Sequence, residues 1–272
     1  MGWSLLGGLM AATGHVTSRD GTRIGYERSG AGPALVLVHG TTADRTRRVP
    51  VLPTFEEHFT VYAMDRRGRG LSGDTEPYAI EREYEDIAAL VDAIEGPAHV
   101  LGHSYGALCA LEAALLTSNV ARLVLYEPAF PTGEPLYPPG RRELFEAMLA
   151  RGDREAVLAT FFREDVGLTG AELEAARAEP SWAARLTSAH TLPREFADGD
   201  YVFDPRPFEA LAVPVLLLTG SESPSVLTAP TAALHAALPQ SRVGVMEGQS
   251  HAAITMAPEL FARLVVDFLT ET

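Results

Sequence analysis

The stretch Leu101-Gly102-His103-Ser104-Tyr105-Gly106 decides how the rest of the chain is interpreted. An apolar run precedes it and a run of small residues follows it, which predicts a strand, a sharp turn and a helix. The turn carries the pattern G-x-S-x-G. A serine hydroxyl is a weak nucleophile and must stand clear of the backbone so that a base can remove its proton. A tight elbow presents Ser104 in this way, and Gly102 and Gly106 avoid collisions across the turn.

The elbow also predicts where an oxyanion would be bound. The new helix directs its free backbone N–H groups at the space above Ser104, so one donor is expected from Tyr105. The second donor is expected from the loop after the apolar strand 34–38. In that loop Thr41 is favoured over Thr42, and Gly40 allows the backbone to come close.

The composition is ordinary for a globular protein and excludes several partners. The chain has 272 residues, of which 46% are hydrophobic and 21% charged, with a formal net charge of -14. A nucleic-acid-binding protein would normally carry a basic face, so no nucleic acid is expected. No apolar run reaches the ~20 residues of a membrane span. Residues 1–13 lack a positively charged start and are expected to be a disordered or leader segment, with the protein in the cytoplasm.

The residues that are missing also limit the chemistry. All 22 basic residues are Arg, so a catalytic lysine is excluded. Cys109 is the only cysteine, so no internal disulfide can form. No His, Cys and Asp residues show metal-ligand spacing, and no G-x-G-x-x-G follows a strand. Neither a metal nor another cofactor is therefore expected, and the expected partner is a small acyl substrate.

Strand and helix patterns alternate in two parts of the chain and stop between them. Buried-strand patterns cover residues 34–38, 59–64, 98–101, 121–126, 213–218 and 242–246. Between Pro128 and Leu211 the chain reads instead as short amphipathic helices. This organisation predicts a mostly parallel α/β core formed by residues 14–127 and 212–272, with a helical cap over 128–211.

A serine nucleophile needs a base, and His251 is the best candidate. It follows the last predicted strand, within the segment 247–253. Parallel strands present their carboxyl ends to one side of a sheet, so a histidine in this loop can lie above Ser104. His39 and His103 stand beside motif glycines and are expected to serve structure.

The order of these motifs resembles the α/β-hydrolase superfamily. The chain has His39-Gly40 after a strand, the segment 65–70, the elbow, a helical insert and a late Gly248-x-x-His251. The resemblance covers nearly the whole chain from about residue 14. It implies an eight-stranded, mostly parallel sheet with a helical cap inserted between strands 6 and 7. It also implies a Ser–acid–His triad in that chain order.

The triad acid is where this sequence departs from the family pattern. The family usually places the acid in the loop after the cap, where Ser223 stands at the expected position and Glu222 is one residue away. One group of haloalkane dehalogenases instead places a Glu after the strand that precedes the cap. Glu127 stands there, and Pro128 predicts an extended conformation for it. We favour Glu127 as the acid and keep Glu222 as the alternative.

The expected activity is the hydrolysis of an ester, thioester or lactone through an acyl-enzyme. A perhydrolase or haloperoxidase would use the same triad, and a C–C bond hydrolase is a further alternative. Haloalkane dehalogenases and epoxide hydrolases are disfavoured because position 104 is Ser instead of Asp. Outside hydrolysis, the alternative is a ligand-binding protein or a pathway-specific cyclase on the same scaffold. The pocket wall is expected to include the cap aromatics Phe130, Tyr137, Phe161, Phe162 and Trp182.

Overall fold

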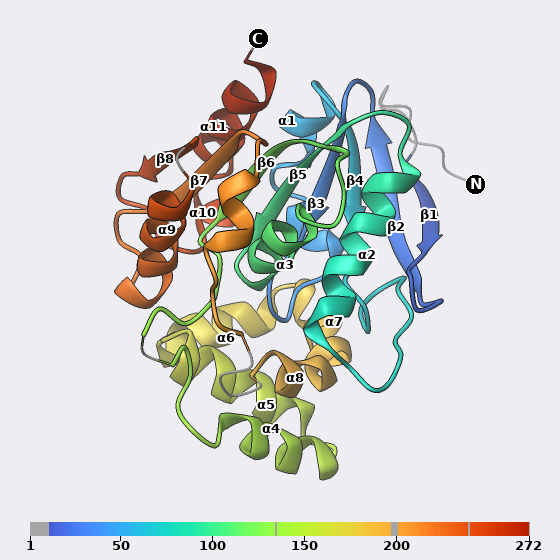
Figure 1. The fold of residues 1–272 in the computed structure, drawn as a ribbon. Helices are drawn as coiled ribbons and strands as arrows, with labels where there is room; N and C mark the ends of the chain where they lie inside the picture. Colours follow the sequence, from blue (N-terminus) through green and yellow to red (C-terminus); the bar gives the residue numbers. More distant parts are fainter. Residues whose placement is uncertain (1–10, 134, 197–200, 239, 272) are drawn as a thin grey trace, which may run out of the picture.

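The computed structural model describes residues 11–133, 135–196, 201–238 and 240–271 (Figure 1). Its centre is an eight-stranded sheet with the order β1-β2-β4-β3-β5-β6-β7-β8. The strands are β1 (Ala12–Thr17), β2 (Arg23–Gly30), β3 (Ala34–Val38), β4 (Thr60–Met64), β5 (Ala98–His103), β6 (Val120–Tyr126), β7 (Val215–Gly220) and β8 (Ser241–Met246). β2 is antiparallel to both neighbours and all other pairs are parallel, which confirms the predicted fold class.

The N-terminal strand begins within the segment assigned to the leader. β1 starts at Ala12 and pairs with β2 through a hairpin around Asp20-Gly21, a dipeptide that favours such turns. Residues 1–10, which form most of that predicted segment, lie outside the described residues.

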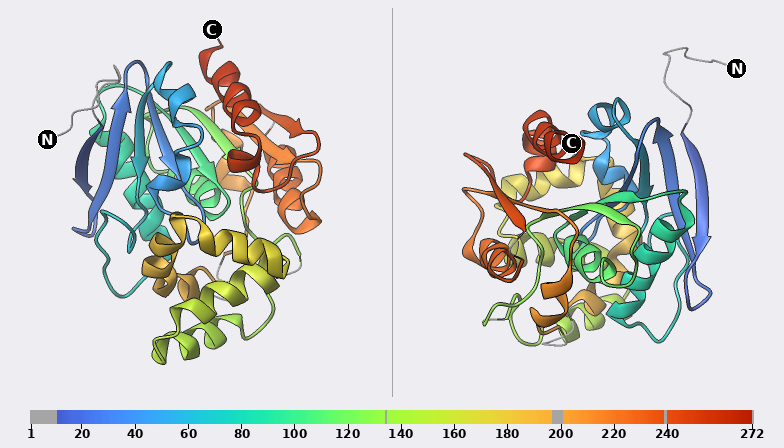
Figure 2. Two further views of the ribbon diagram at one scale, coloured as in Figure 1. Left: turned by 180° about the vertical axis from the view of Figure 1, so that it is seen from behind. Right: turned by 45° about the horizontal axis from the view of Figure 1, so that its top comes forward.

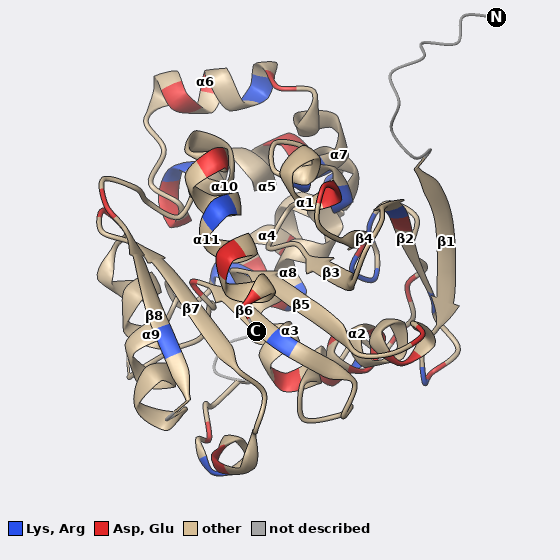
Figure 3. Cartoon of the chain, turned by 90° about the horizontal axis from the view of Figure 1, so that it is seen from above, with Lys and Arg blue, Asp and Glu red and all other residues tan. Residues whose placement is uncertain are grey.

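The middle strands are suited to burial on both faces. β3, β5 and β7 carry no Arg, Asp or Glu, and every residue of β3 is buried. A parallel sheet that is covered on both sides needs such continuous apolar strands. In Figure 3 these strands are tan, the colour of uncharged residues, whereas red and blue segments mark charged residues along the helices.

Helices cover both faces of the sheet (Figure 2). One face packs against α2 (Ile80–Ala93), α3 (Tyr105–Ala113) and α9 (Ser225–Ala237). The other packs against α1 (Leu52–Glu56), α10 (Ala253–Met256) and α11 (Pro258–Thr270). The periodic pattern predicts the longer helices, but α1, α10 and η1 (Arg45–Arg48) are too short to show one. None of the helices in the described ranges has the length and apolar character needed to cross a membrane.

The chain leaves the sheet between β6 and β7 to form the cap, which lies on one side of the sheet in Figure 1. The helices there are α4 (Arg141–Ala150), α5 (Arg154–Thr160), η2 (Phe161–Asp165), α6 (Gly170–Ala178), α7 (Ser181–Ser188), η3 (Ala189–Thr191) and α8 (Leu192–Glu195). They bury a small core of their own that includes Phe145 and Phe196. The last helical turn before β7, η4 (Arg206–Ala210), instead places Phe208 in the core of the sheet.

Candidate active site

Ser104 lies between β5 and α3 with a strained backbone. Its φ is 57° and its ψ is -127°, a conformation that L-residues rarely adopt. The flanking glycines permit it. A Cβ at Gly102 would lie 2.5 Å from the Cα of Ala107, and a Cβ at Gly106 would lie 2.3 Å from the carbonyl oxygen of His39. The collisions expected from the sequence are therefore present, and Ser104 stays partly exposed.

Glu127, directly after β6, forms a hydrogen bond with His251. The distance between Glu127 Oε2 and His251 Nδ1 is 2.5 Å. The carboxylate is fully buried, whereas 27% of the His251 side chain is exposed. The second carboxylate oxygen accepts hydrogen bonds from Thr219 Oγ1 at 3.0 Å and from the Gly220 backbone N–H at 2.8 Å. A carboxylate fixed in this way sets the orientation and the tautomer of the imidazole.

Charge and burial act in opposite directions on Glu127. Burial alone would raise the pKa of the carboxyl group. The hydrogen bond and the charge of His251 outweigh burial, so the pKa lies below its ordinary value. The Ser223 hydroxyl and the Gly220 N–H also lower this pKa. Glu222, the alternative acid, is exposed, and its backbone N–H donates to Gln249 O at 2.9 Å.

The backbone of Glu127 differs from the expectation. The sequence predicts an extended residue before Pro128, but the φ of Glu127 is 44°, in the left-handed region. Its N–H donates to Leu218 O at 3.1 Å in the neighbouring strand, which fixes this turn. Within the described ranges the non-glycine residues with positive φ are Thr42, Ser104 and Glu127. Backbone strain of this kind concentrates at functional sites. Ser104 and Glu127 belong to the predicted site, and Thr42 is the less favoured of the two candidates for the second oxyanion donor.

His103 joins the elbow to the loop that carries His251. Its Nε2 donates to His251 O at 3.2 Å, and the two rings are 4.6 Å apart. Burial lowers the pKa of His103 well below its ordinary value, and the charges of His251 and Arg48 add to this effect. His103 is therefore neutral and serves as a structural donor. Among the described residues no hydrogen bond joins the Ser104 hydroxyl to His251, whereas His103 links the elbow to the loop of His251.

Gly40 brings the loop after β3 against the elbow. A Cβ at this position would lie 2.9 Å from Ser104 Cβ and 3.1 Å from His103 O. The next residue, Thr41, is partly exposed, and Thr42 is buried. Tyr105 is the first residue of α3, where a backbone N–H has no partner within the helix. Both predicted donor residues thus lie on segments that border Ser104.

Alanine at Gly40 is expected to lower kcat by about 10²–10³-fold, the effect of losing one oxyanion donor. The added Cβ has no room beside Ser104 and would displace the loop that carries Thr41. Ester hydrolysis and the melting temperature should be measured together. Gly170→Ala is the matched control because a Cβ there meets nothing within 4 Å. An unchanged kcat in Gly40→Ala would contradict this role for the loop.

A cleft of about 1360 Å³ opens beside the elbow. Tyr105 and Leu108 of α3 line it, together with two of the predicted wall residues, Phe130 and Tyr137. Neither Ser104 nor His251 is among its lining residues. Two lining residues adjoin the nucleophile: Tyr105 follows it in sequence, and the N–H of Ala129 donates to Ser104 O at 3.3 Å.

The other three predicted wall residues do not line this cleft. Phe161, Phe162 and Trp182 pack in the cap, where the ring of Phe162 lies 5.1 Å from that of Phe161 and 5.7 Å from that of Trp182. Short amphipathic helices bury their aromatic side chains against one another first, which explains the difference.

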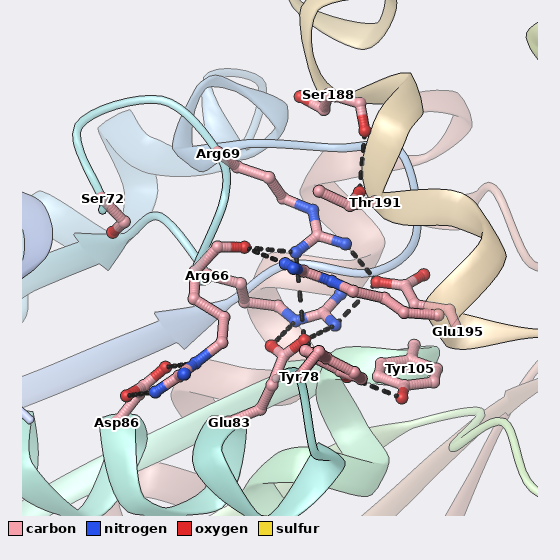
Figure 4. A network of polar contacts seen from close by, with 12 residues as sticks. Arg66, Arg69, Ser72, Tyr78, Glu83, Asp86, Tyr105, Ser188, Thr191 and Glu195 are labelled. Carbon is pink, nitrogen blue, oxygen red and sulfur yellow. Dashed lines mark hydrogen bonds and ion pairs between the residues drawn. The ribbon is translucent and has the colours of Figure 1, made fainter. Parts of the chain in front are cut away.

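The segment 65–70 forms a buried ion-pair network between core and cap (Figure 4). Arg66 donates to both carboxylate oxygens of Glu83, at 2.7 and 2.8 Å, and to Glu195 of α8 at 2.7 Å. Arg69 also pairs with Glu195. The Arg66 guanidinium lies 4.6 Å from the ring centre of Tyr105. One arginine therefore contacts both the cap and the residue after the nucleophile.

This network predicts a dependence of stability on pH. Burial would raise the pKa of Glu83, but Arg66 and Arg69 lower it to about 2 from an ordinary 4.5. The contribution of the ionised Glu83 carboxylate to folding stability is therefore complete above pH 4.5 and is lost as the pH falls toward 2. We expect Glu83→Gln to lower the free energy of unfolding by about 3–5 kcal/mol at pH 6. We expect this difference to shrink in urea titrations at pH 3. The exposed Glu57→Gln is the control, and a difference independent of pH would contradict the assignment.

Comparison with known proteins agrees with this architecture. The chain is 30% identical over 254 residues to the pimeloyl-[acyl-carrier protein] methyl ester esterase of Neisseria meningitidis. The aligned region covers 86% of this chain and 92% of that protein. It is 26% identical over 268 residues to the 2-(acetamidomethylene)succinate hydrolase of Mesorhizobium japonicum, and the aligned region covers 90% of this chain and 91% of that protein. The crystal structure of an alpha/beta hydrolase from Sphaerobacter thermophilus is 38% identical, with a TM-score of 0.83 over 94% of this chain and all of that one.

The family profile itself spans most of the chain. The Alpha/beta hydrolase family matches residues 35–264, from β3 to the last helix. The matched region includes the elbow, the cap and the loop of His251. The resemblance noted from the motifs is thereby confirmed: this protein is an enzyme of the alpha/beta hydrolase family.

Proposed function

We propose that this protein is a cofactor-independent serine hydrolase that cleaves an ester, thioester or lactone with a Ser104–His251–Glu127 triad. The observation that carries the proposal is the buried Glu127 carboxylate, 2.5 Å from His251 Nδ1 and close to the strained elbow. The names of two relatives, a hydrolase of a succinate derivative and a methyl ester esterase, support hydrolysis of a carbonyl compound.

In this mechanism His251 Nε2 accepts the proton of Ser104 as the serine oxygen attacks the substrate carbonyl carbon. The backbone N–H groups of Thr41 and Tyr105 bind the resulting oxyanion. Glu127 remains ionised and stabilises the imidazolium. His251 then protonates the leaving oxygen or sulfur as its bond to the carbonyl carbon breaks. A water molecule, activated by His251, hydrolyses the acyl-enzyme and restores Ser104.

The proposal is tested with p-nitrophenyl esters of increasing chain length, assayed in the presence of EDTA. The expected result is repeated turnover with at least one ester at a rate that EDTA does not change. Absence of both turnover and acylation with every ester would contradict it. A single acylation without turnover would favour the ligand-binding alternative.

A further inference from the structure

Three arginines without an acidic partner gather around the loop after β3. Arg47 and Arg48 belong to η1, and Arg185 belongs to the cap helix α7. Among the residues that the structure describes, no carboxylate lies within ion-pair distance of any of the three. Arg185 Nη1 donates to Thr42 Oγ1 at 2.6 Å, and Arg48 Nη2 donates to Val38 O at 2.6 Å.

Arg48 is buried and Arg47 and Arg185 are half-buried, and their contacts differ from those of the buried arginines of the segment 65–70. Arg66, Arg67 and Arg69 each contact at least one carboxylate, which compensates the cost of burying their charge. Around Thr42 the charge of Asp44 offsets only part of the positive charge. Charge that is incompletely compensated is costly to desolvate, and charged groups with shifted pKa values cluster at functional sites.

The electrostatic environment agrees with an anion site. Burial lowers the pKa of Arg185 to about 10, and repulsion from Arg47 adds to this effect. Burial lowers the pKa of Arg48 to about 9, again with a contribution from Arg47. Asp44 partly offsets the charge of Arg185. One oxygen of the Asp44 carboxylate, Oδ1, accepts hydrogen bonds from the backbone N–H of Thr46 at 2.9 Å and from its hydroxyl at 2.5 Å. One carboxylate thus stands beside three arginines, which leaves an excess of positive charge.

The loop that Arg185 contacts also borders the nucleophile. Arg47, Arg185 and Thr42 line a hollow of about 10 Å³ between α7 and the loop after β3, and Asp44 and Thr46 line it as well. Thr42 is two residues from Gly40, which borders Ser104, and two residues of extended chain span at most about 7 Å. A hollow of this size holds about one water molecule. A larger anion would replace the Thr42 hydroxyl as the acceptor for Arg185.

We infer that Arg185, with Arg47 beside it, binds a carboxylate of the substrate. The preferred substrates are then short acyl compounds that carry a carboxylate a few bonds from the carbonyl that is cleaved, such as monoesters of short dicarboxylic acids. The guanidinium group suits this role because its planar donors match a carboxylate. This assignment of a substrate class rests on the proposed function.

The test compares two methyl esters, monomethyl succinate and methyl butyrate, which differ by a carboxylate in place of a methyl group. Wild type is expected to favour monomethyl succinate in kcat/KM by at least about tenfold. Arg185→Gln is expected to lower that preference by about 10- to 100-fold, mainly through KM. Arg185→Lys should keep part of the preference. Arg163→Gln removes an exposed arginine of the cap and should leave the preference unchanged.

Binding provides a readout that does not depend on turnover. Ser104→Ala is titrated with monomethyl succinate by calorimetry, with and without Arg185→Gln. The expected result is binding that weakens by about 10- to 100-fold when Arg185 is replaced. An equal loss of activity on both esters would show that Arg185 merely supports the Thr42 loop, and a wild-type preference near one would also overturn the inference.

A failure of the subsite can be distinguished from a failure of the proposed function. A fluorophosphonate carries no carboxylate and reports the nucleophile alone. Labelling of Ser104 together with equal rates on the two esters would leave the hydrolase intact and reject the carboxylate site. Absence of labelling would reject the proposed function, and calorimetry with monomethyl succinate would still decide whether Arg185 binds a carboxylate.

Discussion

Replacement of Ser104 by alanine is expected to lower kcat for p-nitrophenyl esters by about 10⁶-fold. The hydroxyl is the proposed nucleophile. In the variant only a water molecule, positioned by the rest of the site, could attack the substrate carbonyl in its place. The measurement is steady-state hydrolysis with the uncatalysed rate subtracted. The melting temperature should change little, because the substitution removes one partly exposed oxygen.

The control for this variant is Ser118→Ala, which replaces an exposed serine after α3. Its activity should equal that of wild type. Residual activity in Ser104→Ala within tenfold of wild type would show that the nucleophile is elsewhere in the chain.

Replacement of Glu127 by glutamine is expected to lower kcat by about 10⁴-fold while the fold is kept. Glutamine has nearly the same shape and can accept one hydrogen bond. It cannot stabilise the imidazolium of His251, and its amide group can hold the ring in the wrong tautomer. The measurement is kcat for the best p-nitrophenyl ester, together with the melting temperature.

Glu222→Gln is the matched control, because Glu222 was the alternative acid and is exposed. Its kcat should stay within about twofold of wild type, as expected for a surface substitution. The opposite pattern, with a collapse in Glu222→Gln and little effect in Glu127→Gln, would move the acid to the loop after the cap.

The parts of the fold that could be predicted are those set by local sequence. The fully apolar strand 34–38 and the elbow around Ser104 have the same form in the structure as in the prediction. Each depends on residues that are close in sequence and on the requirement that a sheet covered on both sides be apolar. Glu127 is favoured over Glu222 because one group of haloalkane dehalogenases places a Glu after the strand that precedes the cap; this assignment stays a prediction, which the hydrogen bond to His251 supports.

The parts that could not be predicted depend on contacts between distant segments. Arg66 meets Glu195 across 129 residues of sequence, so the local motif could be read only as a turn. The positive φ of Glu127 follows from its hydrogen bond to β7, which overrides the preference of a residue before proline. Thr219 also contacts Glu127, and only its place at the end of β7 could have indicated this.

The cap shows the same limit most clearly. Its aromatic residues could be identified, but their division between the cleft and the cap core depends on how short helices pack together. Phe130 and Tyr137 line the cleft, whereas Trp182 is buried in the cap. Arg185 gave no sequence signal, because an arginine on a short amphipathic helix usually faces solvent.

The most direct test of the central claim is peptide mapping by mass spectrometry after treatment with a fluorophosphonate. The proposed triad predicts one label per chain, on Ser104, formed much more slowly in Glu127→Gln and at an unchanged rate in Glu222→Gln. A label on another serine, or ester turnover without any label on Ser104, would contradict the account.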